Sequence, residues 1–109
     1  MRREPIVAIA TSAGKAGVGV IRVSGPDLSE YVRSLFGLNL KPRHATLLDL
    51  YDADQGQIDQ GIAIYYPAPN SYTGEDVFEF QGHGGTVVLQ MVLKRLLEAG
   101  RQFQLRSEE

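Results

Sequence analysis

The fold of this chain is decided by residues 67–85, which run PAPNSYTGEDVFEFQGHGG. The prolines and the Ser-Tyr-Thr-Gly run predict a loop, and the valine and two phenylalanines that follow favour a strand. Gly82, Gly84 and Gly85 predict a turn in which the backbone takes conformations that other residues avoid. An apolar helix is expected next, with its free N–H groups and positive dipole end facing the turn. The stretch therefore combines a polar strand position, room for a flat ligand and a helix start.

Glu79 is the polar position inside that strand. Side chains alternate across a strand, so Glu79 is expected on the face opposite Phe78 and Phe80. Arg22, in a second predicted strand, is its natural partner. One interpretation is a cross-strand salt bridge on a solvated sheet face, which is the commoner use of such a pair. The other is a ligand site, in which the carboxylate accepts hydrogen bonds from an aminopyrimidinone edge and the arginine holds a carbonyl or carboxylate.

The composition of the chain predicts one globular domain. It has 109 residues, of which 43% are hydrophobic and 22% charged. A net charge of −2 argues against a nucleic-acid surface made by this segment alone. The absence of cysteine excludes disulfides, thiolate metal sites and a cysteine nucleophile. Neither a signal peptide nor a membrane span is expected, so a cytoplasmic protein is the expectation.

The order of predicted elements indicates the fold class. Strands are expected over residues 6–10, 18–24, 45–51, 58–66, 77–80 and 102–106. A first helix is expected to start within residues 24–27 and to carry its apolar face over residues 28–36, and a second helix is expected over residues 86–99. Ser24 is expected to cap the first helix, and Gly37 and Gly100 to end the two helices. This β-β-α-β-β-β-α-β order predicts an α+β single domain with a largely antiparallel or mixed sheet.

The helix over residues 86–99 is apolar around most of its circumference. Its polar positions Gln90, Lys94 and Glu98 form one narrow stripe. Such a helix is expected to be buried on more than one side, and a chain of 109 residues has little protein with which to bury it. This pattern indicates an oligomer interface.

Several residue patterns do not meet the requirements of the phosphate-binding, metal-binding or catalytic motifs that they resemble. The glycine-rich run that contains Lys15 lacks the Ser or Thr that a P-loop needs for magnesium, and a strand follows it instead of a helix. His44 and His83 have no second ligand at metal spacing, so no metal site is predicted, and His83 is expected to bond to backbone or ligand. Glu75 and Asp76 are expected to be solvated at the junction of loop and strand. No nucleophile and base are placed together, so no catalytic residue is predicted.

Beyond these motifs, residues 70–76 (NSYTGED), with Glu79 and the GHGG run at residues 82–85, resemble the N-terminal domain of tRNA modification GTPases of the MnmE/TrmE family. The GKAGVGVIRVSG run at residues 14–25 and the DQG run at residues 59–61 fit the same family, so the resemblance covers almost the whole chain. It implies a domain over residues 1–106 similar to the folate-binding domains of aminomethyltransferases. Residues 107–109 would be a tail, and the family's helical and GTPase domains are missing here.

The resemblance also implies a function. The family's domain forms a homodimer and binds 5-formyltetrahydrofolate as a one-carbon-unit site, through an arginine and a glutamate that match Arg22 and Glu79. A further lysine contact of the family lies beyond this segment, so weaker binding by an excised domain is expected. The alternative is a purely structural dimerisation module whose ligand site needs the missing domains.

The whole enzyme of that family modifies the wobble uridine of certain tRNAs with a flavoprotein partner. GTP, potassium and magnesium are expected only in its GTPase domain. This chain lacks a P-loop and is therefore not expected to be catalytic alone. A direct tRNA-binding surface on it is disfavoured by its negative net charge.

Overall fold

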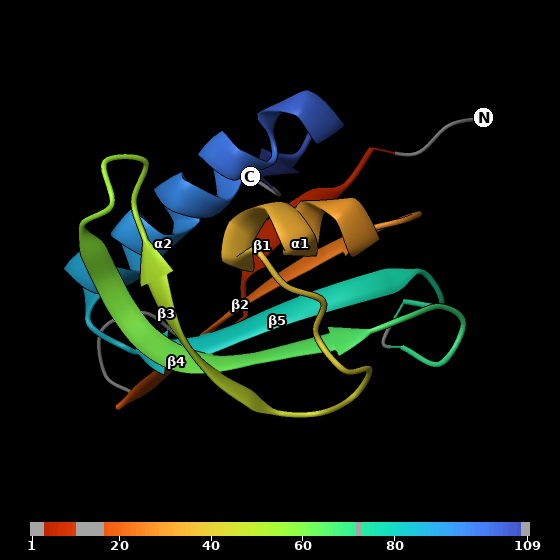
Figure 1. Ribbon diagram of the computed structural model, residues 1–109, viewed down its shortest axis with the longest axis horizontal. Helices are drawn as coiled ribbons and strands as arrows, with labels where there is room; N and C mark the ends of the chain where they lie inside the picture. The colour runs from red at the N-terminus through yellow and green to blue at the C-terminus, as the bar shows by residue number, and fades with distance from the viewer. Residues whose placement is uncertain (1–3, 11–16, 72, 108–109) are drawn as a thin grey trace.

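A computed structural model describes residues 4–10, 17–71 and 73–107, and its elements follow the predicted order (Figure 1). The elements are β1 (Ile6–Ile9), β2 (Val18–Gly25), α1 (Ser29–Phe36), β3 (Thr46–Tyr51), β4 (Gln57–Tyr66), β5 (Asp76–His83), α2 (Thr86–Ala99), the short 3-10 helix η1 (Arg101–Phe103) and β6 (Arg106–Ser107). The predicted α+β class is confirmed.

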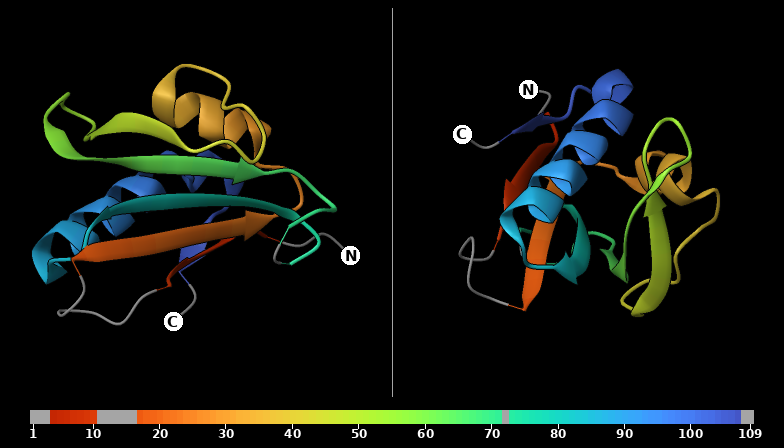
Figure 2. Two further views of the ribbon diagram at one scale, coloured as in Figure 1. Left: turned by 90° about the horizontal axis from the view of Figure 1, so that it is seen from below. Right: turned by 90° about the vertical axis from the view of Figure 1, so that its left-hand side faces the viewer.

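The strands of the described residues form one sheet in the order β3-β4-β5-β2-β1-β6. Neighbouring strands are antiparallel except β1 and β6, which are parallel, so the sheet is mixed as predicted. The sheet is curved, and α1 and α2 lie on the same side of it (Figure 2). We call the side that packs on the helices the inner face and the opposite side the outer face.

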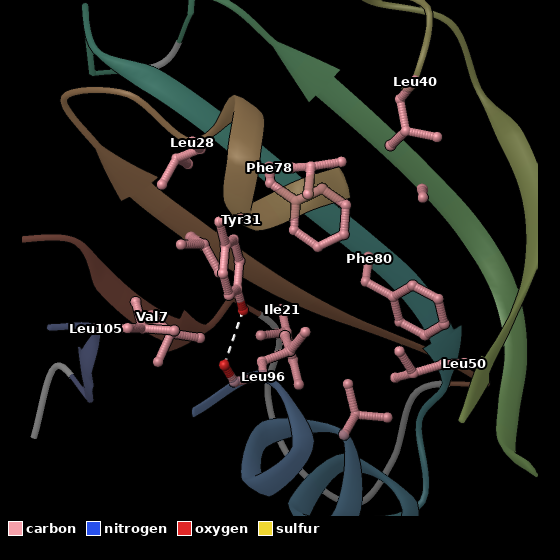
Figure 3. Close-up of a cluster of buried hydrophobic side chains, with 14 of the residues drawn as sticks. Val7, Ile21, Leu28, Tyr31, Leu40, Leu50, Phe78, Phe80, Leu96 and Leu105 are labelled. Atoms are coloured by element: carbon pink, nitrogen blue, oxygen red, sulfur yellow. Dashed lines mark hydrogen bonds between the residues drawn. The ribbon is translucent and has the colours of Figure 1, made fainter. Parts of the chain in front are cut away.

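The hydrophobic core lies between the inner face and the two helices (Figure 3). Alternation along β5 turns Phe78 and Phe80 inward, where both are at most 1% exposed, and alternation along β2 does the same for Ile21 and Val23. Burial of these side chains supplies most of the stability of the fold. The other buried apolar residues are Val7, Leu28, Tyr31, Val32, Leu40, Leu50, Ala63, Val77, Leu89, Val92, Leu96 and Leu105.

Tyr31 joins the two helices inside this core. Its ring meets Phe78 and Phe103 edge to face, at centroid distances of 6.5 and 5.8 Å. Its hydroxyl donates a 2.9 Å hydrogen bond to the carbonyl oxygen of Leu96 (Figure 3). Burial raises the pKa of Tyr31 far above its usual range, so the hydroxyl remains a donor.

Helix α1 starts later than predicted. Strand β2 continues through Gly25, so Ser24 is a strand residue and not the helix cap. Leu28 occupies the N-cap position, and the carboxylate of Asp27 accepts a hydrogen bond from the backbone N–H of Ser29. Gly37 ends the helix in the left-handed conformation at φ 71°, as expected.

The glycine turn predicted at residues 82–85 is not present. Strand β5 continues through Gly82 to His83, and among the described glycines only Gly37 and Gly74 have positive φ. Gly82 is needed for space instead, because a Cβ there would collide with the carboxylate of Asp59. Gly85 has an ordinary extended conformation before α2.

The C-terminal elements differ in detail from the prediction. Helix α2 has the predicted bounds, but η1 replaces most of the strand expected over residues 102–106, and β6 is short.

The inner face and α1 cover more of α2 than expected. Its large apolar residues are buried or half-buried except Val87 and Met91, which are 72% and 44% exposed. The apolar circumference of α2 therefore no longer requires a second copy of the chain.

We predict that Tyr31→Phe lowers the free energy of unfolding by about 1 kcal/mol, because it removes one buried hydrogen bond. The loss stays small because the carbonyl of Leu96 also accepts from the N–H of Gly100. Urea denaturation measures the difference. Tyr51→Phe, at a position that is 43% exposed, is the matched control and is expected to change stability by less than about 0.5 kcal/mol. Equal losses in both variants would contradict the assignment.

Candidate ligand-binding site

Arg22 and Glu79 lie directly opposite each other on the two central strands, on the outer face. Nε and Nη2 of Arg22 donate to the same carboxylate oxygen, Oε2 of Glu79, at 3.0 and 2.8 Å. Glu79 is only 3% exposed, whereas the side chain of Arg22 is 34% exposed. The predicted cross-strand pair is therefore present, and the arginine is its more accessible member.

Gln81 is the third polar member of this cluster, and sequence reasoning missed it. Its Nε2 donates a 2.8 Å hydrogen bond to Oε1 of Glu79. Alternation along β5 could have indicated it, since a residue two positions from Glu79 must share its face. Glutamine carries no charge and is common on strand surfaces, so its role depends on the contact and not on the residue type.

Aliphatic side chains surround the cluster. In the sheet register, Ile64 of β4 is opposite Glu79 and Ala8 of β1 is opposite Arg22. Val20 and Ile62 flank Gln81 in the same way. All four are half-buried. A polar group of three residues on an apolar floor can bind the edge of a flat heterocycle while its ring contacts the aliphatic side chains.

Asp76 begins β5 and fixes the loop that precedes it. Its carboxylate accepts hydrogen bonds from Leu28 N at 3.0 Å, Ala68 N at 2.8 Å and the Tyr65 hydroxyl at 2.6 Å. It is 7% exposed, so the expectation that Asp76 is solvated is wrong. Burial, followed by the hydrogen bond to Asp76, raises the pKa of Tyr65 well above its usual range, so Tyr65 remains a donor.

The loop between β4 and β5 also contacts β2 at this end of the outer face. Ser24 Oγ lies 2.8 Å from the Thr73 hydroxyl, and the hydroxyl of Ser71 donates to the carbonyl of Glu75. Because Ser24 is two residues from Arg22, these contacts place the loop beside the Arg22–Glu79–Gln81 cluster.

His83 and Asp59 form a separate pair at the other end of β5. His83 Nδ1 lies 2.5 Å from Asp59 Oδ1, and the backbone N–H of His83 donates to Asp59 Oδ2 at 2.8 Å. His83 therefore contacts a carboxylate instead of the expected backbone group or ligand. Of the glycine-rich run at residues 14–19, residues 14–16, which include Lys15, lie outside the described residues. Within the described ranges, no three His, Asp or Glu side chains are grouped as a metal site would require.

The chain is similar to one family over nearly its whole length. The family model described as "GTP-binding protein TrmE N-terminus" matches residues 5–107. A tRNA modification GTPase MnmE of Cupriavidus metallidurans is 58% identical over 105 residues, covering 96% of this chain and 22% of that protein. The protein of the same name in Ralstonia nicotianae is 54% identical over 109 residues, covering 100% of this chain and 23% of that protein. The chain thus spans about a fifth of the length of the curated relatives it matches.

No helix in the described part of the chain has the length and apolar character needed to cross a membrane.

We predict that Asp76→Asn lowers the free energy of unfolding by about 2–3 kcal/mol, because the amide nitrogen of asparagine would face at least one of the three donors. Chemical denaturation followed by circular dichroism measures the loss. Asp54→Asn, at an exposed position in the β3–β4 hairpin, is the control and is expected to have little effect. Equal stability of the parent chain and Asp76→Asn would show that Asp76 does not organise this end of the sheet.

Proposed function

The chain belongs to the family of TrmE N-terminal domains, and on this premise we propose that it binds 5-formyltetrahydrofolate as the one-carbon site of a tRNA modification GTPase. The observation that carries the proposal is the Arg22–Glu79–Gln81 cluster on the apolar outer face. The edge of a pterin ring has adjacent N–H donors and a carbonyl acceptor. The cluster offers a cation and amide and carboxylate oxygens that complement such an edge.

The remaining activities are proposed for the whole protein and not for this chain. The relatives are named tRNA modification GTPases, and this chain corresponds to about a fifth of them. We assign GTP hydrolysis, with its magnesium and potassium, to the part that this chain does not contain, because no P-loop is present here. Wobble-uridine modification with a flavoprotein partner, binding of tRNA and a cytoplasmic location are proposed for the whole protein in the same way.

Self-association is the second proposed role, and the outer face supports it. Its exposed apolar side chains include Ile6 at 43%, Val18 at 54% and Leu47 at 62% exposure. They belong to three different strands and surround the polar cluster. A homodimer formed through this face would bury them and would exclude water from the ligand site. Without ligand binding, the chain would be a structural dimerisation module.

We predict that the chain binds 5-formyltetrahydrofolate and that Arg22→Ala and Glu79→Gln each weaken binding at least about thirtyfold. Removing one member of a buried, hydrogen-bonded charge pair costs about 2–5 kcal/mol, partly because its partner is left unpaired. Isothermal titration calorimetry measures the affinities.

Arg33→Ala and Glu30→Gln, at exposed positions of α1, are the matched controls and are expected to bind like the parent. Circular dichroism verifies that every variant is folded. A folded parent that does not bind would reject folate binding by this chain alone and leave the dimerisation module, whose ligand site needs the missing domains. Parent-like binding by both site variants would reject the site.

We predict that the chain is a dimer and that Leu47→Asp raises its dimer dissociation constant at least about tenfold, because the interface would bury an unpaired charge. Sedimentation equilibrium measures the constant. Val87→Asp introduces the same charge on α2, at the most exposed apolar position, and is expected to have no effect. A monomeric parent would refute self-association, and a larger effect of Val87→Asp would place the interface on α2.

A further inference from the structure

We propose that the connector between α1 and β3, with the end of α1 beside it, carries a surface that binds the phosphate backbone of tRNA. The surface consists of Arg33, Lys41, Arg43 and His44, and we call it the basic patch. The proposal rests on the tRNA binding proposed above for the whole protein. It places part of that binding on this chain, away from the proposed folate site.

The charges are unevenly distributed along the chain. The net charge of −2 disfavours a nucleic-acid surface for the chain as a whole. Residues 31–48, however, hold three of the eleven Lys and Arg residues and none of the thirteen Asp and Glu residues. A polyanion responds to the local potential, which depends on nearby charges more than on the total. The net charge therefore does not exclude a phosphate-binding surface on this segment.

The cations of the basic patch are exposed and carry no opposite charge beside them. All four residues of the patch are exposed. Each ion pair within the described ranges involves other side chains, so no carboxylate there pairs with a member of the patch. Nε of Arg33 donates a 3.0 Å hydrogen bond to Oδ1 of Asn39, in the connector. This neutral contact holds Arg33 beside the connector and leaves its charge available.

Residues 41–44 form a β-turn with an unusual third residue. The carbonyl of Lys41 accepts a 3.2 Å hydrogen bond from the N–H of His44, and Arg43 has φ 55°, in the left-handed region. Proline in the second position and a left-handed residue in the third are the pattern of a type II turn, whose third position usually holds glycine. An arginine there strains the backbone, and such strain is often retained where a residue has a function.

The turn is anchored to the rest of the domain. The N–H of Arg43 donates a 2.7 Å hydrogen bond to the carbonyl of Tyr65, near the end of β4, where the yellow connector passes in Figure 1. Leu40, directly before the turn, is buried in the core (Figure 3). The backbone of the turn is therefore fixed, while the long side chains of Lys41 and Arg43 are free to adapt to phosphate groups.

The patch suits a nucleic acid better than a protein partner. Between residues 33 and 45 only Leu38 is a large exposed apolar side chain, whereas the centre of a protein interface needs several. Phosphate oxygens accept hydrogen bonds from Lys and Arg, and a guanidinium can donate two at once. Because tRNA binding is proposed for the whole protein, tRNA is the nucleic acid to which we assign the patch.

The test compares two double variants that lose the same charge. Lys41→Gln/Arg43→Gln removes two cations from the basic patch. Lys94→Gln/Arg101→Gln removes two cations from exposed positions of α2 and η1 and is the matched control. Fluorescence anisotropy measures the affinity of the parent chain and of both variants for an unmodified tRNA transcript. The salt concentration is varied between about 50 and 200 mM, where phosphate contacts weaken steeply. Circular dichroism verifies that each protein is folded.

We expect the parent chain to bind tRNA and Lys41→Gln/Arg43→Gln to bind it about tenfold more weakly at the lowest salt concentration. The slope of log affinity against log salt is expected to become shallower by about two, because each lost phosphate contact removes about one unit. The control is expected to change the affinity by less than about twofold and to keep the parent's slope, since distant charges are screened by salt.

Three results would overturn the assignment. Equal losses in the two double variants would show that tRNA responds only to the net charge of the chain. A folded parent chain that does not bind tRNA would remove the tRNA surface from this chain. Binding to phosphatidylserine vesicles instead of tRNA, lost in Lys41→Gln/Arg43→Gln, would identify a lipid-binding surface.

The same titration of the whole protein separates this assignment from the function on which it rests. If the whole protein binds tRNA and Lys41→Gln/Arg43→Gln does not weaken that binding, the patch is rejected and the function of the whole protein stands. If the whole protein does not bind tRNA, both proposals are rejected.

Discussion

The buried carboxylate of Asp76 is the interaction on which the arrangement of this domain depends. It accepts hydrogen bonds from the end of β4, from the loop after β4 and from the start of α1. These contacts set where β5 begins, opposite Gly25 of β2. From that starting point the antiparallel register places Glu79 against Arg22, three residues further along. A shift of one residue would turn Glu79 into the core and both Phe78 and Phe80 to the outer face, so stability and the candidate site share one register.

The two faces of strand β5 have different roles: one contributes to stability and the other carries the candidate binding site. Phe78 and Phe80 are buried between the sheet and the helices, where they contribute hydrophobic free energy. Glu79 and Gln81 lie on the other face and hold the exposed guanidinium of Arg22. Since both central strands are paired on each side, the backbone beneath the cluster is rigid. Polar side chains on a rigid floor keep their positions without a ligand, which lowers the entropy cost of binding.

Interactions between distant residues account for the differences between expectation and structure. Alternation and helical periodicity depend on neighbouring residues, so the element order and the bounds of α2 followed from the pattern of side chains alone. The local pattern could not predict the role of Gly82, because the carboxylate that would collide with a Cβ at this position belongs to Asp59, on another strand. Asp76 was also misjudged, because its three donors lie up to 48 residues away.

The sequence by itself determined the α+β class, the order of the strands and α-helices, the family and the facing of Glu79 away from the phenylalanines, because each depends on local periodicity or a contiguous motif. The tertiary structure decided which acids are buried, how much of α2 the chain covers, and that Gln81 shares the carboxylate of Glu79 with Arg22. Burial and hydrogen bonding depend on the side chains that folding brings from distant positions. The same residue type can therefore be solvated at one strand end and buried at another.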